Sequence, residues 1–233
     1  MKVAIMQPYV FPYIGYFQLI HAVDIFVFYD DVNFIKRGWI NRNRILVNGK
    51  ESLFTIELSK ASQNKLINEI KILENTKSID QLLKTLEHNY KNAPYFESVF
   101  NLVKDVMNKP YKSISDLAIS SIKSVSNYLE MDILFEISSE KYSETKEMDK
   151  SERLIAIVKK NGFNNYVNPS GGIELYDKLD FKKKGVNLQF IQNELATYIQ
   201  FENEPVIGLS IIDILMFNSI ENTKKLINKY KLT

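Results

Sequence analysis

The apolar positions of this chain fall into short continuous runs and into longer stretches with helical spacing. Lys2–Met6 and Ile25–Tyr29 are almost wholly apolar, and runs this short are typical of buried strands. Between them, apolar positions from Ile14 onward allow a short helix that ends before Asp24. A strand, a short helix and a second strand predict a βαβ unit with parallel strands. Ligands of such sheets bind outside the carboxyl ends of the strands.

Later segments extend this pattern. Asn48-Gly49 between two strand-like runs predicts a hairpin of residues 44–47 and 53–56. Residues 78–130 contain three amphipathic patterns, separated at Pro94 and Pro110, which predict a helical insertion or a layer covering the sheet. Further strands are predicted at 133–137, 165–167 and 186–191, and further helices at about 150–161, 211–217 and 221–231. We therefore predict one α/β domain, residues 1–233, with a Rossmann-like, mostly parallel sheet and flanking helices.

Composition and charge narrow the class of protein. Apolar residues make up 45% of the chain and charged residues 25%, as in an ordinary globular protein. The 30 basic and 28 acidic residues leave a formal charge of +2, which argues against a nucleic-acid or membrane partner. The chain has no cysteine and no apolar stretch approaching 18 residues. We therefore expect a cytoplasmic protein with a small-molecule substrate.

The segment 7–20, Q-P-Y-V-F-P-Y-I-G-Y-F-Q-L-I, is too aromatic for an ordinary turn. Leaving its five rings in water would be unfavourable by roughly 25 cal/mol per Å² of apolar surface, so the loop must pack against something. Because tyrosine has an apolar ring and a polar tip, we predict that this loop forms the wall of a ligand pocket. Its candidate binding residues are Gln7, Tyr9, Tyr13, Gly15 and Tyr16.

Two polar segments follow the second strand. Asp30, Asp31 and Asn33 come at its carboxyl end, where we expect them to face the same crevice as the aromatic loop. The aspartates suit a general base, a metal ligand or an acceptor for hydroxyl groups, and the alternative is a pair of solvated turn acids. No histidine or glutamate lies at metal-ligand spacing near them, so we predict no metal site made by the protein alone.

The segment 36–50 contains five basic residues and no acidic one. Arginine side chains there suit phosphate or carboxylate oxygens, and a tryptophan ring suits stacking on a sugar or base. Arg42 and Arg44 should point to the same side of an extended segment. The alternative is a solvated strand edge whose charges discourage aggregation. The candidate binding residues are Lys36, Arg37, Trp39, Asn41, Asn43 and Arg44, and Arg42 is, with Asp30 and Asp31, a candidate catalytic residue.

A third candidate segment is Asn168-Pro-Ser-Gly-Gly. Ser170, Gly171 and Asn168 could bind phosphate or carboxylate there, with a helical stretch after the glycines directing its positive end to the same place. The alternative is a glycine-rich turn between a strand and a helix.

Several of these blocks together closely resemble the WbqC-like proteins. The blocks are M-Q-P-Y-V-F-P-Y-I-G-Y-F-Q-L-I from Met6, V-F-Y-D-D-V-N-F-I-K from Val27, G-W-I-N-R-N-R-I from Gly38, N-P-S-G-G from Asn168 and G-L-S-I-I-D from Gly208. That family is associated with bacterial surface-polysaccharide (O-antigen) gene clusters. The resemblance implies an enzyme, a ligase or transferase, that modifies a nucleotide-linked amino sugar by adding glycine or another acyl group.

A remoter likeness concerns Tyr13-Ile-Gly-Tyr16, which occupies the place of the His-x-Gly-His motif in adenylate-forming enzymes such as pantothenate synthetase. Gly15 matches, and both histidines are tyrosine here. The likeness implies a HUP-type fold, ATP with Mg²⁺ carried by the nucleotide, phosphate stabilisation by Arg42 and Arg44, and close approach of the nucleotide at Gly15. Asp30 or Asp31 would orient a hydroxyl or amine. The alternatives are a non-catalytic binding protein and acyl transfer from a preformed donor such as acyl-CoA or an aminoacyl-tRNA.

Overall fold

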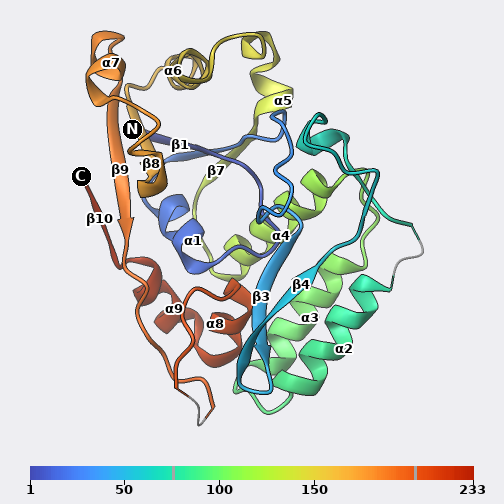
Figure 1. Cartoon of the computed structure of the whole chain (residues 1–233). Coiled ribbons are helices and arrows are strands. Elements are labelled where there is room, and N and C mark those ends of the chain that lie inside the picture. Colours follow the sequence, from blue (N-terminus) through green and yellow to red (C-terminus); the bar gives the residue numbers. More distant parts are fainter. Residues whose placement is uncertain (75–76, 202–203) are drawn as a thin grey trace.

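The computed structural model describes residues 1–74, 77–201 and 204–233, and its centre is a six-stranded sheet (Figure 1). In spatial order the strands are β10 (Tyr230–Leu232), β9 (Asn187–Asn193), β8 (Asn165–Pro169), β1 (Lys2–Met6), β2 (Ile25–Phe28) and β7 (Leu134–Ile137). Neighbouring strands are parallel except for β9 and β10, which are antiparallel. The prediction of an α/β fold with a mostly parallel sheet is confirmed.

Strand β1 lies inside the sheet, and later strands pair on both sides of it. β2 and β7 follow on one side of it, and β8 and β9 follow on the other. Counted along the chain, the parallel strands therefore lie in the order 3-2-1-4-5, which reverses between β1 and β8. In open α/β sheets, the crevice outside the carboxyl ends of the strands at such a reversal is where ligands bind.

Helices cover both faces of the sheet because side chains alternate along each strand. Val3 and Ile5 pack with α6 (Lys150–Lys160) and α7 (Lys178–Lys183) on one face. Ala4 belongs to the larger cluster on the other face, which includes α1 (Ile14–His21), α4 (Ile114–Tyr128), α8 (Ile211–Phe217) and α9 (Ile220–Ile227). Figure 1 shows α6 and α7 at one end of the view and α8 and α9 at the other.

The predicted hairpin is confirmed as β3 (Arg42–Val47) and β4 (Lys50–Thr55). Asn48 and Gly49 both have positive φ, 51° and 74°, as a tight turn between twisted strands requires. The hairpin lies beside α2 (Ser78–Tyr90) (Figure 1), which packs in turn against α3 (Phe96–Met107). The remaining elements are β5 (Leu58–Ser59), β6 (Lys71–Ile72), α5 (Ser138–Lys141) and the 3₁₀ turns Ile67–Glu69, Ser143–Thr145 and Ser170–Gly172.

The three helices predicted in residues 78–130 are confirmed as α2, α3 and α4. The prediction of a helix over 221–231 is wrong at its end, because α9 stops at Ile227 and residues 230–232 form β10. Tyr230 pairs with Asn193 at the edge of the sheet, and this long-range pairing has no local sequence pattern. Within the described residues, no helix is both long and apolar enough to cross a membrane.

Candidate functional site

A cavity of about 360 Å³ lies at the carboxyl ends of β1, β8 and β9, next to the reversal of strand order. Met6, Pro169 and Asn193 are the strand-end residues that line it. Its other lining residues come from the aromatic loop, α1, the hairpin with the turn before it, and the loop before α8. They are Tyr9, Pro12, Tyr13, Gly15, Tyr16, Leu19, Trp39, Asn43, Arg44, Leu195 and Gly208. Seven of the predicted site residues are thus brought together at one place.

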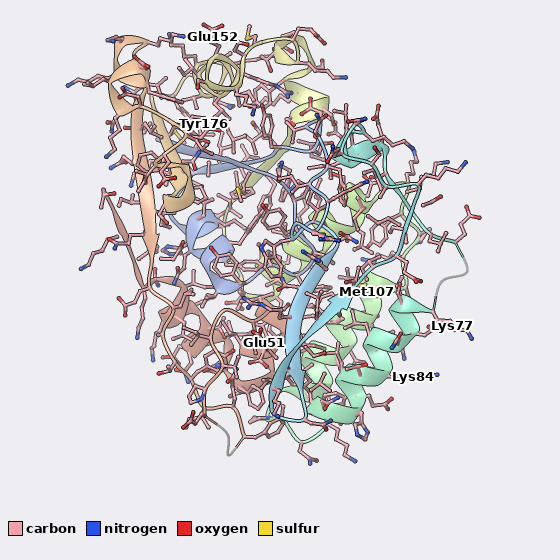
Figure 2. The ribbon with its side chains drawn as sticks, in the orientation of Figure 1. Glu51, Lys77, Lys84, Met107, Glu152 and Tyr176 are labelled. Atoms are coloured by element: carbon pink, nitrogen blue, oxygen red, sulfur yellow. The ribbon has the colours of Figure 1, made fainter. Side chains whose placement is uncertain are left out.

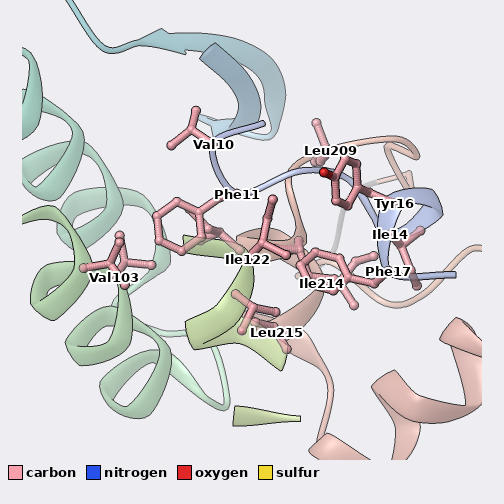
Figure 3. Close-up of a cluster of buried hydrophobic side chains, with 14 of the residues drawn as sticks. Val10, Phe11, Ile14, Tyr16, Phe17, Val103, Ile122, Leu209, Ile214 and Leu215 are labelled. Atoms are coloured by element: carbon pink, nitrogen blue, oxygen red, sulfur yellow. The ribbon is translucent and has the colours of Figure 1, made fainter. Parts of the chain in front are cut away.

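The aromatic loop packs against the protein, as predicted, and its backbone is fixed from several distant segments. Phe11 is fully buried, and its ring points toward Val103 and Ile122 (Figure 3). Its N–H donates to Ser121 Oγ at 3.0 Å, and its carbonyl accepts from Ser210 Oγ at 2.7 Å. Phe11 has φ of 40°, a left-handed conformation that a residue with a side chain adopts only when its surroundings hold it there. The loop is therefore a rigid wall.

Three tyrosines of this wall converge on the cavity. The rings of Tyr9 and Tyr16 lie 5.7 Å apart, and the Tyr16 hydroxyl donates to the Gln7 carbonyl at 2.9 Å. Burial raises the pKa of Tyr9 to about 12 and raises the pKa of Tyr13 as well. Both phenols therefore keep their protons at neutral pH. Within the described residues, neither the Tyr9 nor the Tyr13 hydroxyl has a hydrogen-bond partner.

Tyr13 covers the first turn of α1. A Cβ built on Gly15 would lie 2.7 Å from Tyr13 Oη and 2.6 Å from Cζ. The space over Gly15, where the sequence led us to expect close approach of a nucleotide, is therefore filled by the Tyr13 phenol. In this conformation the Tyr13 ring leaves no room for a phosphate to bind against the backbone of α1 at Gly15.

Arg44 supplies the positive charge of the cavity. Its Nη2 donates to the Gly208 carbonyl at 3.0 Å, and its Nη1 pairs with Glu51 at 3.0 Å across the hairpin. The Trp39 ring centroid lies 5.2 Å from the Arg44 guanidinium and 5.8 Å from that of Arg42. The prediction that both arginines point to the same side is confirmed. Trp39 packs with these guanidinium groups, and Arg42 Nε donates to the Gly38 carbonyl at 2.8 Å.

The two asparagines of the basic segment both form hydrogen bonds to the backbone. Asn43 donates through Nδ2 to the Phe11 carbonyl at 2.7 Å, and its Oδ1 accepts from the Arg44 N–H at 2.9 Å. Asn43 therefore joins the hairpin to the aromatic loop. Asn41 donates to the Ile56 carbonyl at 2.8 Å and is not a lining residue. Asn33, Lys36 and Arg37 are exposed, away from the cavity lining.

Asp30 and Asp31 do not line this cavity, so the expectation that they share it with the aromatic loop is wrong. Both are buried at the end of β2. Asp30 accepts from the Ser139 N–H at 3.0 Å and from Asn68 Nδ2 at 3.1 Å. Asp31 pairs with Arg153 Nη2 at 2.5 Å. Their partners come from α5, α6 and the 3₁₀ turn Ile67–Glu69, and the approach of these elements to β2 depends on the tertiary fold. Their roles in catalysis, and that of Arg42, stay predictions.

The Asn168-Pro-Ser-Gly-Gly segment ends β8. The Asn168 amide donates to the Tyr166 hydroxyl at 2.6 Å. Ser170 and Gly171 are exposed and begin a 3₁₀ turn, while α7 starts only at Lys178. The expected helical stretch directly after the glycines is therefore wrong. Pro169 is the member of this segment that lines the cavity.

Asn193 and Gly208 also line the cavity, although neither was among the predicted binding residues. Asn193 ends β9, and its Nδ2 donates to the Gly15 carbonyl at 3.1 Å and to Gln18 Oε1 at 2.8 Å. Gly208 has φ of 74° and accepts from Arg44. The position of Asn193 just beyond a predicted parallel strand was the available signal.

The lining can bind and orient a ligand. Arg44 is its single ionised side chain, and the described lining residues include no carboxylate, histidine or lysine. No three His, Asp or Glu side chains come together as metal ligands in the described ranges. Aromatic rings, amide groups and an arginine suit a small anionic molecule with a ring that carries hydroxyl or amino groups.

Comparison with known proteins covers nearly the whole chain. Residues 7–225 match the model of the WbqC-like protein family. The chain is 26% identical over 223 residues to a Mycobacterium tuberculosis (strain ATCC 25618 / H37Rv) protein named "Uncharacterized protein Rv1507c", with 92% of each chain covered. No solved structure matches significantly. The family match includes every lining residue of the cavity except Met6.

Proposed function

Because the chain belongs to the WbqC-like protein family, we propose that it binds a nucleotide-linked amino sugar in the cavity beside Arg44 and forms an amide on the sugar amine. The acyl group comes from glycine or another small carboxylic acid. The protein is then a cytoplasmic amide-forming ligase or N-acyl transferase for surface polysaccharide such as O-antigen.

The position of the cavity carries this proposal. It lies outside the carboxyl ends of β1, β8 and β9, and the strand order 3-2-1-4-5 reverses at this point. That arrangement supports a Rossmann-like sheet of HUP type, in which such crevices hold nucleotides. Arg44 suits a diphosphate oxygen, and the tyrosine hydroxyls suit sugar groups.

Binding and orientation are the chemistry that these residues supply. In the proposed reaction, the amine nitrogen attacks the acyl carbon, the bond from that carbon to its leaving group breaks, and the amine proton goes to the leaving group. The described lining has no side chain that accepts a proton at neutral pH, so the leaving group itself takes the proton. Holding both reactants at reacting distance is worth about 7–11 kcal/mol in well-oriented systems.

Product analysis tests the proposal. Nucleotide-linked amino sugars are incubated with the protein and either glycine, ATP and Mg²⁺, or acyl-CoA without ATP, and products are detected by mass spectrometry. An amide together with AMP supports a ligase that activates the acid with ATP, and an amide formed without ATP supports transfer from a preformed donor. Aminoacyl-tRNA serves as a further donor. If none of the donors gives a product, the proposed reaction is contradicted.

A non-catalytic nucleotide-sugar binding protein is the second candidate. It is favoured by the lack of a neutral-pH proton acceptor among the described lining residues. A ligand that binds the folded state raises its stability by about 2.7 kcal/mol at a hundredfold excess over Kd. Thermal stabilisation by nucleotide sugars without product therefore supports this candidate. Arg44→Ala should clearly reduce the stabilisation, whereas Lys84→Ala, a change on the outward face of α2 (Figure 2), should not.

A further inference from the structure

The cavity changes in character from its floor to its rim. The floor includes Tyr16, 3% exposed, and Leu19, 1% exposed. The rim includes Trp39, 40% exposed, and Arg44, whose side chain is 33% exposed. The ionised side chain of the described lining thus lies at the rim. A phosphate on the floor would lose its hydration without gaining a cation, which is strongly unfavourable.

The first turn of α1 does not offset that cost. The Tyr13 phenol fills the space over Gly15, so a phosphate cannot reach the backbone there while the ring keeps this place. The Tyr13 and Tyr9 hydroxyls, protonated at neutral pH, instead present hydrogen-bond donors to a ligand oxygen. Uncharged polar groups such as sugar hydroxyls match these donors.

Asn193 presents an acceptor, and a chain of hydrogen bonds determines which of its atoms is free. Gln18 Nε2 donates to the backbone carbonyls of Glu194 and Lys229, both at 3.0 Å, which orients the Gln18 amide. Gln18 Oε1 must then accept from Asn193 Nδ2, which also donates to the Gly15 carbonyl. Asn193 Oδ1 has no partner among the described residues. It can accept from a ligand amine or hydroxyl.

We infer that the ligand binds with its sugar end beside Asn193 and Tyr13, where the amino group donates to Asn193 Oδ1 and a sugar oxygen accepts from the Tyr13 hydroxyl, while its diphosphate lies at the rim against Arg44. Tyr13 and Asn193 are then the residues that determine specificity for the sugar. This inference rests on the proposed function and adds the orientation of the substrate.

Calorimetric titration with two ligands tests the orientation. One ligand is a uridine-diphosphate-linked amino sugar and the other is uridine diphosphate alone. Tyr13→Phe should weaken binding of the sugar ligand roughly three- to tenfold and leave binding of the diphosphate unchanged, because one neutral hydrogen bond is lost. Arg44→Ala should weaken both ligands at least tenfold. Tyr95→Phe, on the surface in the described structure and outside the cavity, is the matched control and should change neither.

Asn193→Ala provides a second, independent variant, with its fold checked by circular dichroism. It should remove the preference of the wild type for the amino sugar over the same nucleotide-linked sugar without the amine. If wild type binds both ligands and Tyr13→Phe weakens them equally or not at all, the orientation is wrong although the proposed function stands. If wild type binds neither ligand, the proposed function itself fails, and the orientation with it.

Discussion

Asp31 and Arg153 form a buried ion pair between the end of β2 and α6. Asp31 Oδ2 lies 2.5 Å from Arg153 Nη2, and each side chain is 4% exposed. Arg153 also donates through Nε to Thr145 Oγ1 at 3.2 Å and lies 4.7 Å from the ring centroid of Tyr29. The charge of Asp31 is therefore neutralised within the protein and helps to hold α6 against the sheet.

Removing Arg153 should destabilise the protein strongly. Arg153→Met leaves the Asp31 carboxylate buried without its cation, and losses of about 3–5 kcal/mol are typical of such changes. Urea unfolding measures the free energy of unfolding. Lys183→Met is the matched control, because its pair with Asp180 is exposed and should be worth about 1 kcal/mol or less. Equal losses for the two variants would contradict a structural role for the buried pair.

Asp213 should make stability depend on pH. It is fully buried and accepts hydrogen bonds from Tyr90, Tyr198 and Gln200. Burial raises the pKa of Asp213, and these hydrogen bonds only partly oppose the shift. The folded state then binds the proton more tightly than the unfolded state, so the contribution of Asp213 to stability falls as pH rises above about 4. The unfolding free energy of wild type minus that of Asp213→Asn should therefore decrease from about pH 4 to pH 7. Urea titration of both proteins at several pH values measures it. A constant or growing difference would refute the shift.

Asn43→Ala should impair both stability and ligand binding. The change removes the hydrogen bond to the Phe11 carbonyl and leaves the Arg44 N–H without its acceptor, at a cost of about 1–3 kcal/mol. Because Asn43 joins the hairpin to the aromatic loop, affinity for nucleotide sugars should fall as well. Asn41→Ala is the matched control, since its hydrogen bond lies outside the cavity lining. The prediction fails if Asn41→Ala lowers affinity as much as Asn43→Ala.

Gly15→Ala should show coupling to Tyr13. In a helix, alanine is ordinarily about 1 kcal/mol more favourable than glycine. Here the added Cβ would collide with the Tyr13 ring, so we expect no stabilisation. In a Tyr13→Ala background the collision is gone, and Gly15→Ala should become stabilising. A double-mutant cycle by urea unfolding should give a coupling energy within about 0.5–3 kcal/mol, and additivity would show that the ring does not occupy this space.

Local patterns predicted most of the elements. Short apolar runs and helical spacing depend only on residues close in the sequence. They therefore identified the strand Lys2–Met6, the helix from Ile14 and the strand from Ile25. The turn at Asn48-Gly49 was identified because positive φ at both positions favours these residues. The strand 230–232 was missed because its partner, β9, lies almost forty residues earlier in the chain.

The candidate site was predicted less completely than the fold. Tyr9 and Tyr13 stood out because aromatic residues are unusual in a loop, and Trp39 and Arg44 because a ring and a guanidinium suit a sugar and a phosphate. All four line the cavity. Asp31 looked equally promising, since its sequence neighbours give no sign of Arg153, more than a hundred residues later. Asn193 looked ordinary, because its role depends on the hydrogen bonds of Gln18.

Hydrophobic periodicity and turn chemistry act over a few residues, so the α/β class, the βαβ unit at the N-terminus, the hairpin and the aromatic loop that walls the cavity could be predicted from the amino-acid sequence. Which polar side chains face a ligand, and which are paired inside the protein, depends on the three-dimensional fold. Burial and pairing depend on partners distant in the chain. Thus Asp31 is neutralised by Arg153, the Tyr13 ring covers Gly15, and Asn193 Oδ1 has no hydrogen-bond partner among the described residues.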